Sequence, residues 1–497
     1  MRIRHALPLL LLTSSAPALA DPGDEAATHL QRIAATDDAG PELNAVMVAK
    51  EPSVLTAEVA AAAANRPLAG RTVLVKDNIE TREWPTTAGS LALAGNMTGR
   101  DAPLIARLRA AGGVVLGKTN LSEWANIRSG NSTSGWSAVG GLTKNPHALD
   151  RNACGSSSGS GAAVAAHLAW AAIGTETDGS ITCPASVNGI VGFQPTVGLV
   201  SRTHVIPISA SQDTAGPMTR SVADAALLLN AIAGPDPADP ATAEAGAHLT
   251  DFTAGLESAS LTGMRIGVLR KQVGNDTRVA ALFDAALEDL KRAGAELVEI
   301  DYEMPGRMGE AEFTVLLYEL RRDLRAYLSG SPAEIPVRSL ADVIAFNRAH
   351  AGAEMRWFGQ ELFYMAKGAT DRGLYERARA NSLRLAGPEG IDKLLSEHDL
   401  ELLVAPTTGP AWTTDLVNGD NYDGSVGAGS LAAIAGYPHL TVPMGAVHGL
   451  PVGLSLIGAK WSDAAILNAG AAYEKARTAE LPAPSFERWS DTKAYIN

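Results

Sequence analysis

The chain has 497 residues, of which 46% are hydrophobic and 5% aromatic, and its formal net charge is −13. This length and apolar content suffice to bury one large core or two ordinary ones. Because an acidic surface repels phosphate backbones and no long basic run is present, we expect no nucleic-acid partner.

The N-terminus has the features of a signal peptide over residues 1–20. Arg2 and Arg4 precede an apolar stretch at 7–12, and Ala18 and Ala20 are the small residues that a signal peptidase requires. Prolines and the lack of polar periodicity disfavour an amphipathic first helix. We expect an exported protein, periplasmic or secreted, cleaved near Ala20, and losing the two arginines takes the charge of −13 to −15. No later stretch reaches the ~18 to 20 apolar residues of a membrane span.

Strand and helix patterns then alternate along the chain. Residues 26–65 are predicted helical around a Gly40-Pro41 break, and the Gly/Ser-rich residues 130–161 are predicted to be loop. Predicted strands cover 72–75, 114–116, 170–173, 189–191, 266–269, 296–300, 402–404, 439–442 and 452–457, and predicted helices cover 103–111, 162–166, 279–293 and 464–476. This alternation predicts an α/β fold with a mixed, mostly parallel central sheet covered by helices on both faces.

One stretch, from about 305 to 395, is charged and helix-rich and interrupts the strand rhythm. We predict a helical insertion there, within a single domain at 21–497 whose core comprises about 21–300 and 396–497. Such additions often shape a substrate pocket, and covering the sheet is the simpler role.

The two cysteines, Cys154 and Cys183, allow two states. In an exported protein they could form a disulfide, whereas buried free thiols are the common alternative. No C-x-x-C motif or nearby histidine joins them, so we expect no metal site. The sequence leaves their pairing open.

Residues 112–119 match the phosphate-binding pattern G-x-x-x-x-G-K-[ST] letter for letter. A phosphate loop needs its middle residues to form a loop whose amides point at the phosphate. Here the middle contains Val114-Val115-Leu116, an apolar run that favours a strand. We interpret the match as coincidental and expect no nucleotide cofactor.

Three further segments could carry chemistry, although each alone is a weak signal. Lys76 ends an apolar run; buried, it would be a base because desolvation lowers the pKa of an amine, whereas a surface lysine is the ordinary alternative. Residues 154–161 have the composition of a linker but lie between structured segments. Residues 174–180 leave a strand for a tight turn that could expose consecutive backbone N–H groups.

Together, in this order, these segments resemble the amidase signature family. The resemblance covers Gly155-Ser156-Ser157, Gly179-Ser180-Ile181 and residues 189–196, and it extends to Lys76-Asp77-Asn78, 117–123, 213–218, 405–407, 436–438, 443–445 and 450–453. These segments span most of the chain that follows the predicted signal peptide.

The resemblance implies a Ser-Ser-Lys triad. Ser180 would be the nucleophile, Ser156 a bridging serine in a cis peptide, and Lys76 the base. A serine hydroxyl becomes a good nucleophile only when a base takes its proton, and a bridging hydroxyl can both donate and accept one. The intermediate would be a Ser180 ester, formed without a cofactor or metal.

The resemblance also implies an oxyanion hole and supporting contacts. Its donors would be the backbone N–H groups of Thr177, Asp178, Gly179 and Ser180. Each oxyanion donor contributes on the order of 2.7–4 kcal/mol. Ser157 and Thr175 would join the two loops by hydrogen bonds, with turn capping as the simpler role. Asn126 would bind the substrate backbone, or act as a capping residue.

Three positions depart from the common family spelling: Glu176, Asp178 and Thr182 stand where Asp, Gly and Arg are usual. We interpret Asp178 as a change of side chain only, since the oxyanion contact uses the backbone. Residues 123–126, 154–161 and 174–183 resemble the peptide amidase branch, which removes the C-terminal amide of peptides and leaves internal peptide bonds intact.

We therefore expect a peptide or other small-molecule amide as substrate. A broad amidase or esterase acting on small aliphatic or aromatic amides is the alternative, and a catalytically silent binding protein is an alternative of another class.

The signal peptide and acidic charge disfavour the family's tRNA-dependent amidotransferases. No G-x-S-x-G motif surrounds Ser180, which disfavours a Ser-His-Asp site, and His204 could lie near the pocket in a filling role. The oligomeric state is undetermined.

Overall fold

The structure, a computed structural model, describes residues 22–62, 65–422 and 424–490. The predicted signal peptide lies outside these residues. Within them, every helix is too short or too polar to cross a membrane.

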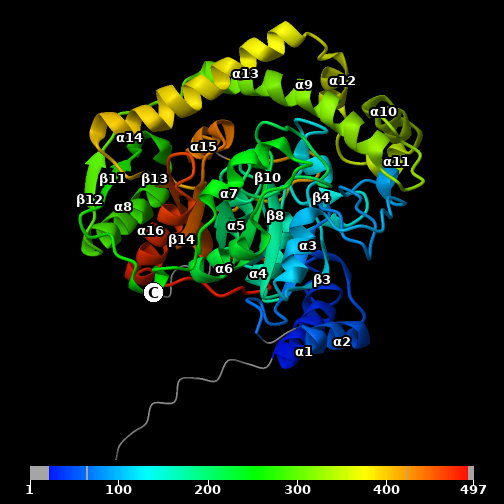
Figure 1. Ribbon diagram of the computed structural model, residues 1–497, viewed down its shortest axis with the longest axis horizontal. Coiled ribbons are helices and arrows are strands. Elements are labelled where there is room, and N and C mark those ends of the chain that lie inside the picture. The colour runs from blue at the N-terminus through cyan, green and yellow to red at the C-terminus, as the bar shows by residue number, and fades with distance from the viewer. Residues whose placement is uncertain (1–21, 63–64, 423, 491–497) are drawn as a thin grey trace, which may run out of the picture.

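A sheet of eleven strands runs through the described part of the chain (Figure 1). In spatial order its strands are β1 (Val46–Ala49), β3 (Val114–Thr119), β2 (Thr72–Lys76), β8 (Ala171–Glu176), β10 (Thr214–Thr219), β9 (Val191–Gln194), β14 (His439–Val447), β15 (Leu450–Ile457), β13 (Leu402–Pro406), β11 (Arg265–Val268) and β12 (Glu296–Glu299). Neighbours pair in parallel within β3–β2–β8 and within β13–β11–β12, and antiparallel in the other six pairs. The predicted mixed sheet is confirmed, with its parallel pairs gathered in these two blocks.

Helices cover both faces of the sheet, as predicted. One face carries α3 (Pro103–Ala110), α6 (Val222–Ile232), α8 (Thr277–Arg292) and α16 (Asp463–Ala476). The other carries α1 (Pro22–Arg32), α2 (Pro52–Ala61), α4 (Ser158–Ala165), α5 (Thr182–Val187), α14 (Asp392–His398) and α15 (Gly429–Ala435). Side chains alternate along a strand, so Val73 and Val75 pack with the first group and Leu74 with the second. By the same alternation Lys76 projects toward the face that carries α4.

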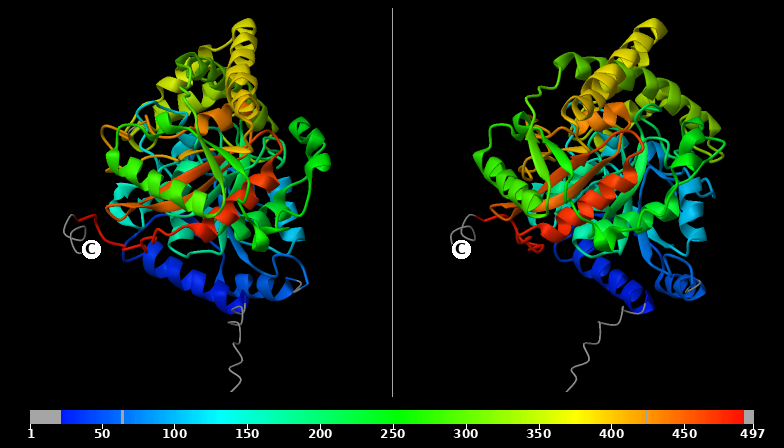
Figure 2. Two further views of the ribbon diagram at one scale, coloured as in Figure 1. Left: turned by 90° about the vertical axis from the view of Figure 1, so that its left-hand side faces the viewer. Right: turned by 60° about the vertical axis from the view of Figure 1, so that its left-hand side comes forward.

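Residues 306–398 are largely helical, in the range where the sequence predicts an insertion. They form α9 (Gly306–Gly330), α10 (Leu340–Ala349), α11 (Ala351–Glu354), α12 (Glu361–Gly368), α13 (Arg372–Ala386) and α14. The long helices α9 and α13 pack on each other and arch over one side of the molecule (Figures 1 and 2). Apolar side chains of α9, α10 and α12 join Leu93 and Trp124 in a core separate from that of the sheet.

Three strand predictions require correction. Residues 26–65 are not helical throughout, because 46–49 form the edge strand β1 beside β3. Strand β10 was not predicted, since its sequence TAGPMT lacks a strand pattern; it forms between two partners, β8 and β9. The strand expected at 189–191 lies at 191–194.

The Gly/Ser-rich stretch 130–161 is loop with short pairs of strands, β4 (Trp136–Ser137) with β5 (Gly141–Leu142) and β6 (Lys144–Asn145) with β7 (Ala148–Asn152). Its last residues begin helix α4. A Cβ at Gly159 would lie 2.3 Å from the carbonyl oxygen of Ala45, so only glycine lets α4 approach the edge of the sheet this closely. This close packing fixes the position of the loop that precedes the helix.

Candidate active site

A pocket of about 370 Å³ lies between the turn after β8 and the loop before α4. Its described lining comes from residues 125–127 and 134, 154–155, several residues between 177 and 183, Ile208, Met304, Leu316, and several residues between 407 and 430. Segments far apart in the sequence therefore build one cavity, and Ser180 is on its wall.

Lys76, at the end of β2, is fully buried close to this pocket. Its Nζ donates hydrogen bonds to Ser156 Oγ at 2.7 Å, to Thr175 Oγ1 at 2.8 Å and to the Thr175 carbonyl oxygen at 3.1 Å. The burial that the predicted role as a base requires is thus observed, and the role itself stays a prediction.

The environment of Lys76 favours the neutral amine. Burial lowers its pKa from 10.5 to about 7, while the charges of Glu176 and Asp213 raise it in part. Near neutral pH a large share of the molecules therefore hold Lys76 as a neutral amine, which can donate its two N–H bonds to the Thr175 oxygens and accept the Ser156 hydroxyl proton with its lone pair.

The loops that carry Ser156 and Ser180 are fastened to each other. The peptide bond between Gly155 and Ser156 is cis, as the resemblance implies. The Ser157 N–H donates to the Ser180 carbonyl oxygen at 3.1 Å, and Ser157 Oγ exchanges hydrogen bonds with the backbone of Thr175. Ser157 and Thr175 thus join the two segments by hydrogen bonds, and their role in supporting the reaction stays a prediction.

A disulfide joins the same two loops. Cys154 and Cys183, whose pairing the sequence leaves open, are bonded with their Cα atoms 6.0 Å apart. Cys154 lies two residues before Ser156 and Cys183 three residues after Ser180, so the bond restrains the loops that carry both serines.

The turn before Ser180 is organised by the buried carboxylate of Glu176. It accepts the backbone N–H groups of Gly179 at 2.9 Å, Ile181 at 2.6 Å and Thr182 at 2.9 Å. Burial raises the pKa of Glu176 to about 7. Gly179, with φ +78°, points its N–H at Glu176. The prediction that this N–H is one of the four oxyanion donors is therefore corrected, because it is already bonded to a carboxylate; the other three stay a prediction.

Comparison with known proteins identifies the family. A sequence model of the Amidase family matches residues 27–467. The chain belongs to the amidase family. It is 40% identical over 430 residues to a probable amidase from Arabidopsis thaliana, covering 84% of this chain and 78% of the relative.

Solved structures place this amidase beside the peptide amidases. The native peptide amidase from Stenotrophomonas maltophilia shares 50% identity and a TM-score of 0.88, over 94% of this chain and 95% of that one. An amidase family protein from Bacillus anthracis is more distant, at 33% identity and a TM-score of 0.83, over 93% of this chain and 89% of that one.

Asn126 lies on the pocket wall of the amidase. Its Nδ2 donates to Ser134 Oγ at 2.9 Å, and its Oδ1 accepts from Ser132 Oγ at 3.3 Å. These bonds hold the side chain in one orientation beside the cavity. Its contact with the substrate stays a prediction.

Sequence reasoning missed several groups around the pocket. Asp420 accepts from the Ser134 N–H at 3.0 Å and from Trp412 Nε1 at 3.2 Å, and Ser430 Oγ donates to Asp178 Oδ2 at 2.8 Å. Asp420 and Ser430 lie outside every quoted motif, so no local pattern signals them. The only sequence feature that points to these contacts is Asp178 itself, an aspartate where the family usually has glycine.

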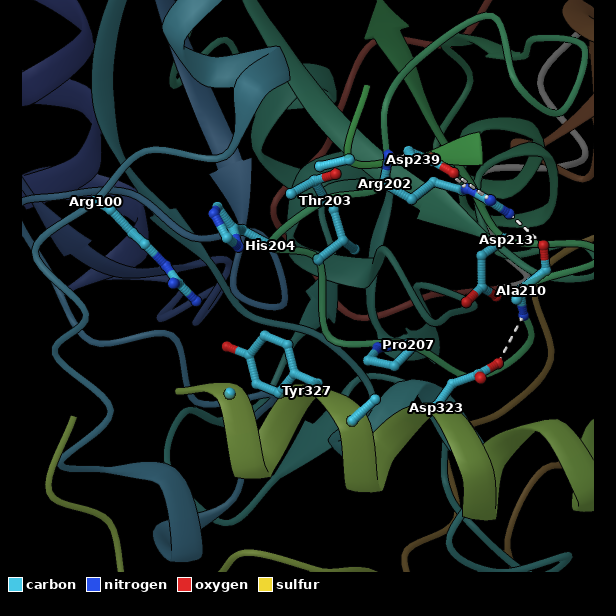
Figure 3. Close-up of a pocket in the computed structure, with 14 residues that line it drawn as sticks. Arg100, Arg202, Thr203, His204, Pro207, Ala210, Asp213, Asp239, Asp323 and Tyr327 are labelled. Atoms are coloured by element: carbon cyan, nitrogen blue, oxygen red, sulfur yellow. Dashed lines mark hydrogen bonds and ion pairs between the residues drawn. The ribbon is translucent and has the colours of Figure 1, made fainter. Parts of the chain in front are cut away.

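The amidase has a second pocket, of about 490 Å³, which Figure 3 shows. Arg100, Arg202 and Tyr327 line it, and Arg202 pairs with Asp239 through Nη2 at 2.7 Å. His204 lines this second pocket rather than the pocket of Ser180. The histidine therefore lies outside the wall of the Ser180 pocket.

The segment 112–119, which matches the phosphate-loop pattern, forms part of the central sheet of the amidase. Residues 114–119 form strand β3, and Lys118 is buried with its Nζ 2.9 Å from Asp77 Oδ1. The segment is not a loop around a phosphate, in agreement with its interpretation as a coincidence.

Proposed function

We propose that this amidase hydrolyses its substrate through Ser180, with Lys76 as the base and Ser156 as the proton relay. The observation that carries the proposal is the buried 2.7 Å contact between Lys76 Nζ and Ser156 Oγ. A neutral amine beside one serine hydroxyl can accept its proton, and that hydroxyl can then take the proton of a second serine.

In the proposed reaction, Ser180 Oγ attacks the amide carbonyl as its proton passes to Ser156 and that of Ser156 to Lys76. The negative charge of the tetrahedral intermediate is stabilised by the backbone N–H groups of Thr177, Asp178 and Ser180. The C–N bond breaks as Ser156 returns a proton to the leaving nitrogen. Water, deprotonated by the same relay, then cleaves the Ser180 ester and releases the acid.

The proposed substrate is the C-terminal amide of a peptide, with ammonia as the leaving group. Its support is the 50% identity to peptide amidases over more than nine-tenths of the chain. The pocket of about 370 Å³ is in the range that holds small ligands.

Export is part of the proposal. The predicted signal peptide supports it, and so does the disulfide, because disulfides persist in oxidising compartments. Cell fractionation tests it: activity in the periplasm or medium is expected, and activity confined to the cytosol would contradict it.

The function is tested by ammonia release from one peptide offered as its C-terminal amide and as its free acid, beside benzamide. We expect ammonia from the peptide amide, loss of that activity in Ser180→Ala, and normal activity in Ser258→Ala, an exposed serine outside the pocket lining. A preference for benzamide would favour a broad amidase instead.

A further inference from the structure

The charged side chains that line the Ser180 pocket, among the described residues, are all acidic. Among the described residues that line it are two carboxylates, Asp178 and Asp420, and no lysine, arginine or histidine. Apolar side chains such as Leu316 and Met304 make up much of the remaining wall. A negative field inside a partly apolar cavity acts on any charged group that enters, because low-dielectric walls screen it weakly.

The first of these carboxylates, Asp178, lies two residues before Ser180 in the turn after β8. The half-buried side chain is held by two partners from distant segments. Ser430 Oγ, from the first turn of α15, donates to Oδ2 at 2.8 Å, and Glu312 of α9 makes a carboxyl–carboxyl hydrogen bond with it.

The proton between the two carboxyl groups resides on Glu312. Burial and the neighbouring Asp178 charge raise the pKa of Glu312 to about 9. Gln212 Nε2 donates to Glu312 Oε1 at 2.8 Å, which leaves the other Glu312 oxygen to carry the proton toward Asp178. Burial raises the pKa of Asp178, and the hydrogen bonds donated by Ser430 and Glu312 oppose that shift because they stabilise its charged form.

We propose that Asp178 is a specificity-determining residue that selects substrates by charge. It favours amides with a positive group beside the reacting carbonyl, such as those of lysine or arginine, and disfavours amides that carry a carboxylate there. The inference rests on the proposed role of Ser180 and its pocket. The apolar wall suits the aliphatic stem of a basic side chain.

The same charge acts on the product. Hydrolysis replaces a neutral amide by a carboxylate at the carbon next to Ser180. Repulsion from Asp178 then weakens binding of the acid and clears the site.

The experiment compares N-acetyl-lysine amide, N-acetyl-norleucine amide and N-acetyl-glutamate amide in the wild type and in Asp178→Asn. In the wild type we expect kcat/KM to fall in that order. One unit charge about 10 Å away at an effective dielectric near 20 changes binding on the order of tenfold. Asp178→Asn should therefore reduce both the lysine-to-norleucine and the norleucine-to-glutamate ratio by about tenfold, and N-acetyl-norleucine should inhibit it more strongly.

Two control variants distinguish selection by the Asp178 charge from the effect of changing a carboxylate of α9. Glu310→Gln removes a charge from the exposed side of α9 and should leave the ratios unchanged. Glu312→Gln keeps the Asp178 charge and an N–H donor beside it, so it should keep the preference for lysine. If the ratios in Asp178→Asn stay within twofold of the wild type, or change equally in Glu310→Gln, the proposal is overturned.

If Asp178→Asn fails to fold, the wild type still tests whether the site selects substrates by charge. A glutamate amide that is cleaved as well as the lysine amide overturns the proposal. If no peptide-like amide is cleaved, the proposed substrate class is wrong. Selection by charge is then tested on 4-aminomethylbenzamide, 4-methylbenzamide and 4-carboxybenzamide, for which the same order is expected and the reverse order contradicts it.

Discussion

The burial of Lys76 makes a measurable prediction about stability. The folded protein holds this lysine with a pKa of about 7, whereas its ordinary value is 10.5. Between these two values the unfolded chain binds a proton that the folded chain does not. The stability of the protein should therefore rise with pH over this interval, through Lys76 alone.

The size of the effect follows from the two pKa values. The penalty for burying Lys76 is about 4 kcal/mol at pH 7 and about 2 kcal/mol at pH 9, and it vanishes above the unfolded pKa. Lys76→Met fills a similar volume and cannot titrate. The free energy of unfolding of the wild type, relative to Lys76→Met, should thus increase by about 2 kcal/mol from pH 7 to pH 9.

Urea unfolding of both proteins at pH 7, 8 and 9 measures this difference. Lys367→Met, at an exposed position of α12, is the matched control for exchanging a lysine for methionine. A difference between wild type and Lys76→Met that stays constant over these pH values would refute the depressed pKa, and with it the reasoning that makes Lys76 a base.

Three further predictions concern the site. The kcat/KM on a peptide amide should fall about tenfold per pH unit well below pH 7, as Lys76 becomes protonated; a rate that stays flat down to pH 4 would contradict a neutral-lysine base. Glu176→Gln removes a charge that raises the pKa of Lys76, so the acid limb of this profile should move to lower pH, and a limb moved upward would refute the coupling. Replacing Cys154 and Cys183 together by alanine removes a cross-link between residues 29 apart, which gives the unfolded chain more conformational freedom. The free energy of unfolding in urea should fall by about 3–4 kcal/mol, and unchanged stability would show that the bond does not restrain the chain.

Much of the sheet could be predicted from local patterns. Apolar runs such as 72–75 and 402–404 form buried strands, and amphipathic runs such as 279–293 form helices. A short continuous apolar run suits a strand buried on both faces, whereas apolar residues three and four apart lie on one face of a helix. Strand β10 could not be found this way. Its Gly216 and Pro217 break the pattern, and only pairing with β8 and β9 makes it a strand.

The sequence by itself determined which residues are available for the reaction. Lys76, Ser156 and Ser180 were identified from the order of their segments, and the family follows from that order as well. The residue types are compatible with that chemistry, since a buried amine and hydroxyl groups can pass a proton, and the resemblance to the family is what assigned the roles.

Only the tertiary structure decided how these residues are held and what else faces the pocket. The pairing of Cys154 with Cys183 and the contacts of Asp178 with Ser430 and Glu312 join residues that are far apart in the sequence. Asp178 and Ser430 are 252 residues apart. No local pattern specifies such a contact, because the packing of α9 and α15 around the sheet brings the partners together.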